Sequence, residues 1–168
     1  MMVGPDMCGK TNIIAELSNR TGIKPFKASS EHRAFLGSQK SFLNDLLYAD
    51  PRVCDFIKQM GVSVLFDRAF PCEYAYSKHF GRKTDIRMLK RVDEMYADLG
   101  TKIVVCTRNS FEGIQDDLDA EIDEWALKKI SSHYMDFLSW TKCKSMILYV
   151  DDENLDREIE EILKFINE

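Results

Sequence analysis

The stretch Gly4-Pro5-Asp6-Met7-Cys8-Gly9-Lys10-Thr11 is a complete G-x-x-x-x-G-K-[ST] loop near the start of the chain. In such a loop the glycines let the backbone curl, so that successive N–H groups point inward and surround phosphate oxygens. The lysine reaches the outer phosphates, and the threonine hydroxyl is a ligand for Mg²⁺. The stretch therefore predicts a phosphate-binding site at the start of a helix, where the helix dipole also favours an anion.

The residues on either side of the loop fit a strand–loop–helix unit. Ile13, Ile14 and Leu17 share one face of a segment that Gly22 ends, which predicts an amphipathic helix after the loop. Only residues 1–3 precede the loop, so we expect either that the strand before it is very short or that the chain begins inside it.

Composition limits the class of protein. The chain has 168 residues, of which 45% are hydrophobic and 30% charged, which predicts one globular domain over residues 1–168. The net charge of −5 argues against broad electrostatic binding to nucleic acid, and no apolar run approaches the length that a membrane span needs. The five cysteines are widely spaced without a C-x-x-C pair, which is typical of reduced thiols in a cytoplasmic protein.

Strand-like apolar runs alternate with helical patterns along the chain. This alternation predicts an α/β fold with three layers, in which a mostly parallel, five-stranded sheet carries helices on both faces. Ligands are then expected at the carboxyl ends of the strands. Beyond the first strand, we expect strands near residues 24–28, 62–66, 102–106 and 145–150, and helices near residues 31–60, 71–99, 120–140 and 155–166. The first of these helical regions is expected to break near Asp50-Pro51, and the second to be interrupted around Gly81.

A second pair of polar residues, Asp67-Arg68, directly follows the buried strand expected at residues 62–66. A carboxylate at this edge of the sheet lies near the phosphate loop, where it can hold Mg²⁺ or orient a reacting oxygen. The planar guanidinium of the arginine is suited to phosphate. An ion pair or a helix cap without a catalytic role remains the alternative interpretation of the two residues.

With these features the chain resembles the thymidylate kinases and the related phage deoxynucleoside-monophosphate kinases. The resemblance is carried by G-P-D-x-x-G-K-T with Asp6, by Asp67-Arg68 followed by Tyr74-Ala75-Tyr76, and by a last strand that runs into Val150-Asp151-Asp152. It implies a P-loop NTPase fold. It also implies transfer of the γ-phosphoryl group of ATP to the 5′-phosphate of a deoxynucleoside monophosphate, with a dTMP-like pyrimidine favoured.

The resemblance further implies roles for single residues. Lys10, Asp67 and Arg68 are the implied catalytic residues, and Thr11 with Asp67 is the implied Mg²⁺ site. Asp6 accepts a hydrogen bond from the acceptor's sugar hydroxyl, Arg68 holds its phosphate or the group in flight, and one of Tyr74 and Tyr76 packs near the sugar or base. The residues implied to bind ATP are Gly4, Met7, Cys8, Gly9, Lys10, Thr11, Asn12, Arg108 and Asp151.

The exit of the second strand, at residues 29–33, is expected to open the acceptor pocket. Arg33 and either Phe35 or Phe42 are candidates to bind the acceptor there, although an aromatic residue on an amphipathic helix is more often part of the core. Glu31 keeps open the interpretation that the acceptor is a deoxynucleoside, because deoxynucleoside kinases tend to carry a glutamate near this point as a base.

The expected lid, about residues 108–121, departs from the family. Such kinases usually close an arginine-bearing lid over the phosphates, whereas residues 112–124 contain seven acids and no base. A solvated, acid-rich helix start explains this equally. The positive charge that a lid would bring to the phosphates then comes from Arg68 or from a basic run of residues. This run is interpreted as a phosphate clamp, as a binding surface for a polynucleotide, or as a charged outer face of a helix. Its residues are Lys78, Arg82, Lys83 and Arg87.

Three alternatives to the monophosphate kinase therefore stay open. The acceptor can be a deoxynucleoside, or a hydroxymethylated pyrimidine within DNA, or the chain can be a nucleotide-binding module without catalysis. A GTP-dependent switch is disfavoured, because the chain has no N-K-x-D tetrapeptide. A homodimer is also open, with its contact on the helices after the second and third strands.

Overall fold

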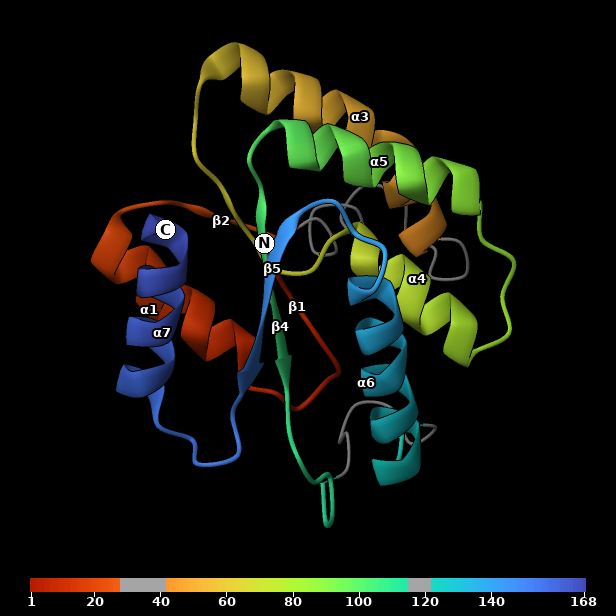
Figure 1. The fold of residues 1–168 in the computed structure, drawn as a ribbon, viewed down its shortest axis with the longest axis vertical. Helices are drawn as coiled ribbons and strands as arrows, with labels where there is room; N and C mark the ends of the chain where they lie inside the picture. The colour runs from red at the N-terminus through yellow and green to blue at the C-terminus, as the bar shows by residue number, and fades with distance from the viewer. Residues whose placement is uncertain (28–41, 115–121) are drawn as a thin grey trace.

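The structure is a computed structural model that describes residues 1–27, 42–114 and 122–168 (Figure 1). Within the helix that begins at residue 42, side chains are described from Leu47 onward, except at residue 48. The described elements are β1 (Met2–Val3), α1 (Lys10–Thr21), β2 (Pro25–Phe26), α3 (Phe42–Met60), β3 (Leu65–Phe66), α4 (Phe70–His79), α5 (Ile86–Asp98), β4 (Lys102–Thr107), α6 (Glu124–Leu138), β5 (Lys144–Tyr149) and α7 (Leu155–Asn167).

All paired strands run parallel, which confirms the predicted α/β class. They form a three-stranded sheet in the order β1-β4-β5 and a two-stranded sheet of β2 and β3. A single parallel bridge between Met2 and Asp67 links the two sheets. The prediction of one continuous five-stranded sheet is therefore wrong, because β1, β2 and β3 have only two residues each and β3 meets β1 at one bridge.

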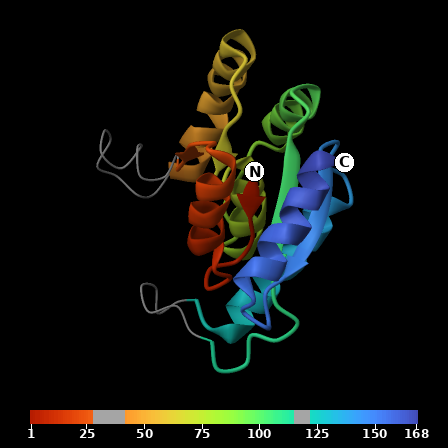
Figure 2. The same cartoon turned by 90° about the vertical axis from the view of Figure 1, so that its left-hand side faces the viewer.

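Helices cover both sides of the strands, as the alternating pattern predicted. Helices α1 and α7 lie together on one side, and α3, α4, α5 and α6 lie on the other (Figures 1 and 2). The core between them is apolar, since Ile103, Val104 and Val105 of β4 are buried together with Leu89 of α5 and Ile159 of α7.

Helix α4 is the most deeply enclosed helix near the site. Eight of its ten residues, from Phe70 to Ser77, are buried, since α6 packs along one side of it and α3 and α5 along the other. The helical region expected over residues 71–99, with its interruption around Gly81, consists of two helices, since Gly81 takes a φ of 61° just beyond α4. The start of the helical region expected at 31–60 lies outside the described residues, and the break expected near Asp50-Pro51 is wrong, because α3 continues through Pro51. None of the described helices is long and apolar enough to span a bilayer.

Candidate active site

The loop between β1 and α1 has the conformation that its glycines allow. Gly4 has a φ of 139°, and a Cβ at this position would collide with the carbonyl oxygen of Cys106 in β4. Gly9, the residue before α1, lies in the left-handed region with a φ of 63°. Backbone N–H groups of Asn12 and Ile13 donate to the carbonyl oxygen of Gly9, at 3.0 and 3.2 Å. The loop therefore turns tightly into the helix, as a phosphate-binding loop does.

Lys10 lies inside the loop rather than in solvent. Its side chain is buried, and its ammonium donates a hydrogen bond to the carbonyl oxygen of Pro5. Burial lowers the pKa of Lys10, and the nearby Arg68 guanidinium lowers it further. By contrast, Thr11 and Asn12 are exposed at the first turn of α1. The hydroxyl of Thr11 is thus accessible at the point where the motif expects a metal-bound phosphate.

Asp67 and Arg68 lie beside this loop because β3 ends next to β1. The amide of Arg68 donates to the carbonyl oxygen of Met2 at 3.0 Å, and Arg68 itself has a φ of 65°. Asp67 is buried, and its carboxylate forms an ion pair of 3.0 Å with the ammonium of Lys27. Lys27 was missed at the sequence level. The available signal was its place just after the expected second strand, at the same edge of the sheet.

Asp6, Arg68 and Tyr76 form one connected cluster. The Arg68 guanidinium and the Tyr76 hydroxyl each donate to a different oxygen of the Asp6 carboxylate. The guanidinium also donates to the Tyr76 hydroxyl at 3.3 Å and lies 5.7 Å from the ring centroid. Burial alone would raise the pKa of Asp6, but Arg68, Tyr76 and Lys10 together lower it below its usual value. The carboxylate is therefore charged, and its two partners fix its position.

These groups surround a pocket of about 190 Å³ at the carboxyl edge of the strands. One wall is the phosphate loop and the start of α1, and the other consists of Asp67, Arg68 and Lys27. Three cations and two carboxylates therefore face a common space. The residues lining it are Asp6, Met7, Cys8, Gly9, Lys10, Thr11, Asn12, Lys27, Asp67 and Arg68.

The donor set in this pocket suits Mg²⁺. A hydroxyl oxygen of Thr11 and a carboxylate oxygen of Asp67 line the same space. Among the residues that the structure describes, no group of three or more His, Cys, Asp or Glu side chains could hold a metal ion. Mg²⁺ usually keeps several waters and uses one or two protein oxygens together with substrate phosphates, so the oxygens of Thr11 and Asp67 are a suitable pair.

Arg108 and Asp151, expected near the donor base, lie beside each other at the ends of β4 and β5. The Arg108 guanidinium donates to the carbonyl oxygen of Met7 at 3.2 Å and to Glu153 at 3.1 Å. Asp151 accepts from the backbone and side-chain amides of Asn109, at 2.8 to 3.1 Å. Arg108 therefore links the phosphate loop to the turn after β5, while Asp151 holds the start of the loop after β4.

Tyr74 lies away from the cluster that contains Tyr76. Its hydroxyl donates to Asp136 of α6 at 2.7 Å, and its ring packs against Phe137 and Trp140. The buried helix α4 therefore turns the Tyr74 side chain toward α6, and Tyr74 does not line the pocket. Of the two tyrosines, Tyr76 is the one beside Asp6 and Arg68.

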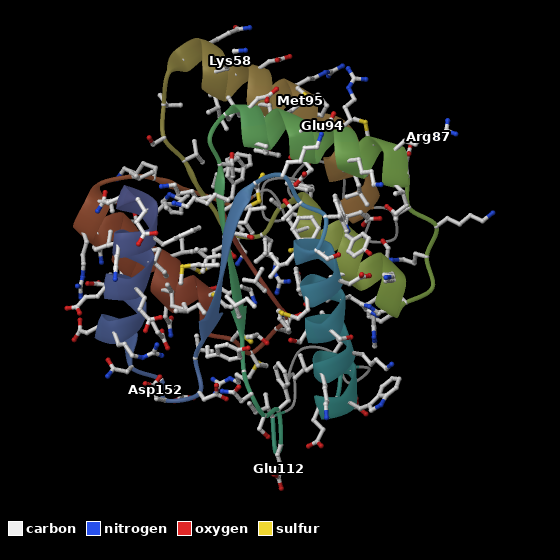
Figure 3. All side chains as sticks on the ribbon, viewed as in Figure 1. Lys58, Arg87, Glu94, Met95, Glu112 and Asp152 are labelled. Atoms are coloured by element: carbon white, nitrogen blue, oxygen red, sulfur yellow. The ribbon has the colours of Figure 1, made fainter. Side chains whose placement is uncertain are left out.

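Two further substrate candidates, Arg33 and the side chain of Phe42, lie outside the described residues, as do Glu31 and Phe35. Part of the acidic lid is described. Glu112 lies at the tip of the loop after β4 (Figure 3), while residues 115–121 lie outside the description. Asp123 accepts from the amide of Ala126 and begins α6, which fits the interpretation of a helix start. In the described part of the chain, no residue of the basic run 78–87 lines the pocket.

No family model and no curated protein matches the chain. Solved structures do match it over nearly its whole length. The YorR protein of Bacillus subtilis, in complex with phosphorylated GDP, is 18% identical with a TM-score of 0.72, covering 99% of this chain and 94% of its own. The chain has the fold of a P-loop kinase.

Two kinases share this fold at lower similarity. Deoxyadenosine kinase from M. mycoides, with bound dATP, is 16% identical with a TM-score of 0.59, covering 99% of this chain and 98% of its own. Thymidylate kinase from Ehrlichia chaffeensis is 14% identical with a TM-score of 0.59, covering 98% and 96%. The predicted likeness to thymidylate-kinase-like proteins is thus confirmed at the level of the fold.

Proposed function

We propose that the protein is a nucleotide kinase, which transfers the γ-phosphoryl group of ATP to the 5′-phosphate of a deoxynucleoside monophosphate, a dTMP-like pyrimidine being favoured. The observation that supports this most directly is the pocket at the carboxyl edge, because the phosphate loop faces Asp67 and Arg68 across it. A site for two phosphate-bearing molecules needs positive charge on both sides, and Lys10 and Arg68 supply it.

In this proposal the loop amides and Lys10 hold the donor phosphates. Phosphate entering the pocket would draw the ammonium of Lys10 from the Pro5 carbonyl oxygen, and the negative charge would raise the pKa of the lysine. Arg68 would hold the acceptor phosphate or the group in flight. The acceptor phosphate oxygen is already a nucleophile at neutral pH, so alignment and charge neutralisation suffice without a strong general base.

The residues Thr11 and Asp67 would hold Mg²⁺, directly or through its waters. The ion would supply neutralisation of the charge on the β- and γ-phosphates. The ion pair of Asp67 with Lys27 balances the buried carboxylate before any cation binds. Lys27 therefore joins the proposal as a residue that holds the Asp67 side chain in place.

Asp6 is proposed to bind the acceptor's sugar. Its carboxylate already accepts hydrogen bonds from Arg68 and Tyr76, and a carboxylate has capacity for further donors, such as a sugar hydroxyl. Arg108, which bonds to the loop at Met7, is proposed to lie beside the donor base, with Asp151 nearby. The kinase identity of similar folds, including a thymidylate kinase and a deoxyadenosine kinase, supports the reaction class.

The deciding experiment offers a panel of deoxynucleoside monophosphates, deoxynucleosides and DNA containing hydroxymethylated pyrimidine to the protein with γ-labelled ATP and Mg²⁺. We expect label on the monophosphates as diphosphate product, with dTMP or a modified pyrimidine preferred. Label only on nucleosides or only on DNA would replace this acceptor with one of those. Nucleotide binding with no transfer to any acceptor would reduce the chain to a binding module.

A further inference from the structure

Exposed aromatic rings gather where the end of α4 meets the start of α6. Trp125 is 62% exposed and Phe80, just after α4, is 40% exposed. His79 lies between them, since its ring centroid is 4.8 Å from that of Phe80 and 6.5 Å from that of Trp125. We call these three residues the ring strip. The strip joins two helices but leaves most of Trp125 open to solvent, so core packing alone does not account for it.

Cations lie against the same rings. The guanidinium carbon of Arg82 is 5.6 Å from the centroid of Phe80, and the ammonium of Lys129 is 5.6 Å from the centroid of Trp125. Neither cation forms an ion pair with any carboxylate in the described ranges, whereas the nearby Lys78 is paired with Asp136. Arg82 and Lys129 therefore keep their charge available for an external anion.

The positive charges around the strip act together on a neighbour. Burial lowers the pKa of His133 on α6, and the charges of Lys78, His79 and Lys129 lower it further. The Asp136 carboxylate, which binds the Lys78 ammonium, acts in the opposite direction and raises the pKa of His133. Asp123 and Glu124 directly precede Trp125, so the positive charge offered to an anion at the strip comes from Arg82 and Lys129, which lie against the rings.

Ring contacts connect the strip to the cluster of Asp6, Arg68 and Tyr76. The ring centroid of Phe80 is 6.4 Å from that of Tyr76, one helical turn earlier on α4. Tyr76 in turn donates to Asp6 and lies under the Arg68 guanidinium. Helices α4 and α6 pack along each other (Figure 1), and the ring contacts lead from Tyr76, beside Arg68, to the exposed rings of the strip.

We propose that the ring strip binds single-stranded nucleic acid, with bases stacked on Phe80, His79 and Trp125 and with backbone phosphates near Arg82 and Lys129. Stacking platforms interleaved with cations are the arrangement by which proteins bind single strands without sequence preference. Bases in a duplex are stacked on each other and offer no faces to such rings. A mononucleotide has a single base and would use one ring of the three. This binding goes beyond phosphoryl transfer and does not require it.

The test is a titration of a labelled oligo-dT of about ten nucleotides, a length within the range of such sites, followed by anisotropy. We expect saturable binding that weakens as salt rises. Trp125→Ala should weaken binding by about tenfold, the size of one lost base stack. Phe56→Ala removes a ring that is 59% exposed on α3, far from the strip, and is expected to leave the affinity unchanged. Lys129→Ala should reduce the slope of log affinity against log salt by about 0.7, one phosphate contact.

Three results would overturn the proposal: no binding at low salt, equal losses for Trp125→Ala and Phe56→Ala, or duplex DNA bound as tightly as the single strand. Transfer of phosphate to a mononucleotide is measured on the same variants. Because Trp125 does not line the pocket, Trp125→Ala is expected to keep that activity. If Trp125→Ala loses oligonucleotide binding but keeps phosphate transfer, the proposed role of the ring strip is supported. If the unsubstituted protein transfers no phosphate, that result contradicts only the kinase proposal.

Discussion

The two edges of the sheet carry hollows of opposite chemistry. At the amino edge, a hollow of about 380 Å³ is lined mainly by apolar residues such as Leu17, Val64 and Ile162. At the carboxyl edge, the pocket is only about 190 Å³, yet ammonium, guanidinium and carboxylate groups surround it. Lys102, a cation at the amino edge, donates to the carbonyl oxygens of Phe165 and Ile166 and so is already satisfied. Chemistry, rather than size, therefore separates the candidate site from a gap in the packing.

The difference follows from the direction of the strands. In a parallel sheet the loops that follow each strand meet at one edge, so the residues after β1, β2 and β3 converge there. The residues that precede the strands meet at the other edge, where α1, α7 and the connection into β4 supply apolar side chains. Substitutions at the carboxyl edge are therefore expected to lower activity, whereas substitutions at the amino edge are expected to lower stability.

The largest expected effect is that of Lys10→Ala at the carboxyl edge. Loss of a cation aimed at the transferred phosphates is expected to lower kcat by about 10³-fold, while the thermal midpoint stays close to that of the parent. Lys58→Ala, at the far outer end of α3 (Figure 3), is the matched control and should retain full turnover. Turnover by Lys10→Ala near that of the control would exclude this loop as the active site.

Arg68→Ala is expected to damage transfer more than ATP binding. The change removes the guanidinium that faces the loop, so kcat/KM for the acceptor should fall by about 10²-fold, with the Kd for ATP changed by less than about threefold. Arg20→Ala removes an exposed arginine that pairs with Glu16 and Asp156, and it controls for loss of charge alone. Weakened ATP binding with an unchanged acceptor KM would instead assign Arg68 to the donor side.

Leu17→Ala tests the amino edge. Leu17 is buried and lines the larger hollow, so its truncation enlarges a cavity and is expected to lower the free energy of unfolding by about 3 kcal/mol. Urea denaturation measures this loss, and kcat of the folded enzyme at low temperature should remain within about twofold of the parent. A loss of kcat with full stability would show that the amino edge contributes to the reaction.

A smaller effect is expected from Asp50→Asn, behind the same hollow. Burial raises the pKa of Asp50 to about 7, although the Tyr96 hydroxyl donates to its carboxylate at 2.7 Å. Since the unfolded carboxyl titrates near 4, the folded protein binds the proton more tightly, and stability should fall as pH rises from about 4 to 7. Asn removes this dependence and should stabilise the protein by about 2 kcal/mol at pH 8.

Asp55→Asn is the matched control for that experiment, since Asp55 is exposed on the same helix. Denaturation of both variants and the parent at pH 5 and pH 8 separates the two carboxyl groups. A parent whose stability is equal at the two pH values would contradict the raised pKa of Asp50.

Features set by local sequence were predictable. The glycine spacing of the loop fixed its backbone, and Asp67-Arg68 followed a buried strand, so parallel pairing was enough to expect them beside the loop. The helix after the loop, the strands near 102–106 and 145–150 and the closing helix were also evident from their apolar patterns. In each case one short stretch of chain carries the whole signal.

Features set by packing between elements were not predictable. Tyr74 and Tyr76 both belong to a helix that is buried nearly all round, so no polar face indicated which of them turns to Asp6. Lys27 follows a strand of only two residues, and its partner Asp67 is 40 positions later in the sequence. The sheet is divided because only a single bridge, at Met2, links its two parts, and no pattern of residues in the sequence predicts that bridge.

That bridge gives β1 an importance out of proportion to its length. Met2 pairs with Val104 on one side and with Asp67 on the other, and its carbonyl oxygen receives the amide of Arg68. If the pairing there shifted by one residue, the loop of residues 4–11 would move relative to Arg68 by more than about 3 Å. In the proposed reaction, the two residues of β1 would thus set the alignment of donor and acceptor. The centre of the sheet and the pocket would then form in a single folding event.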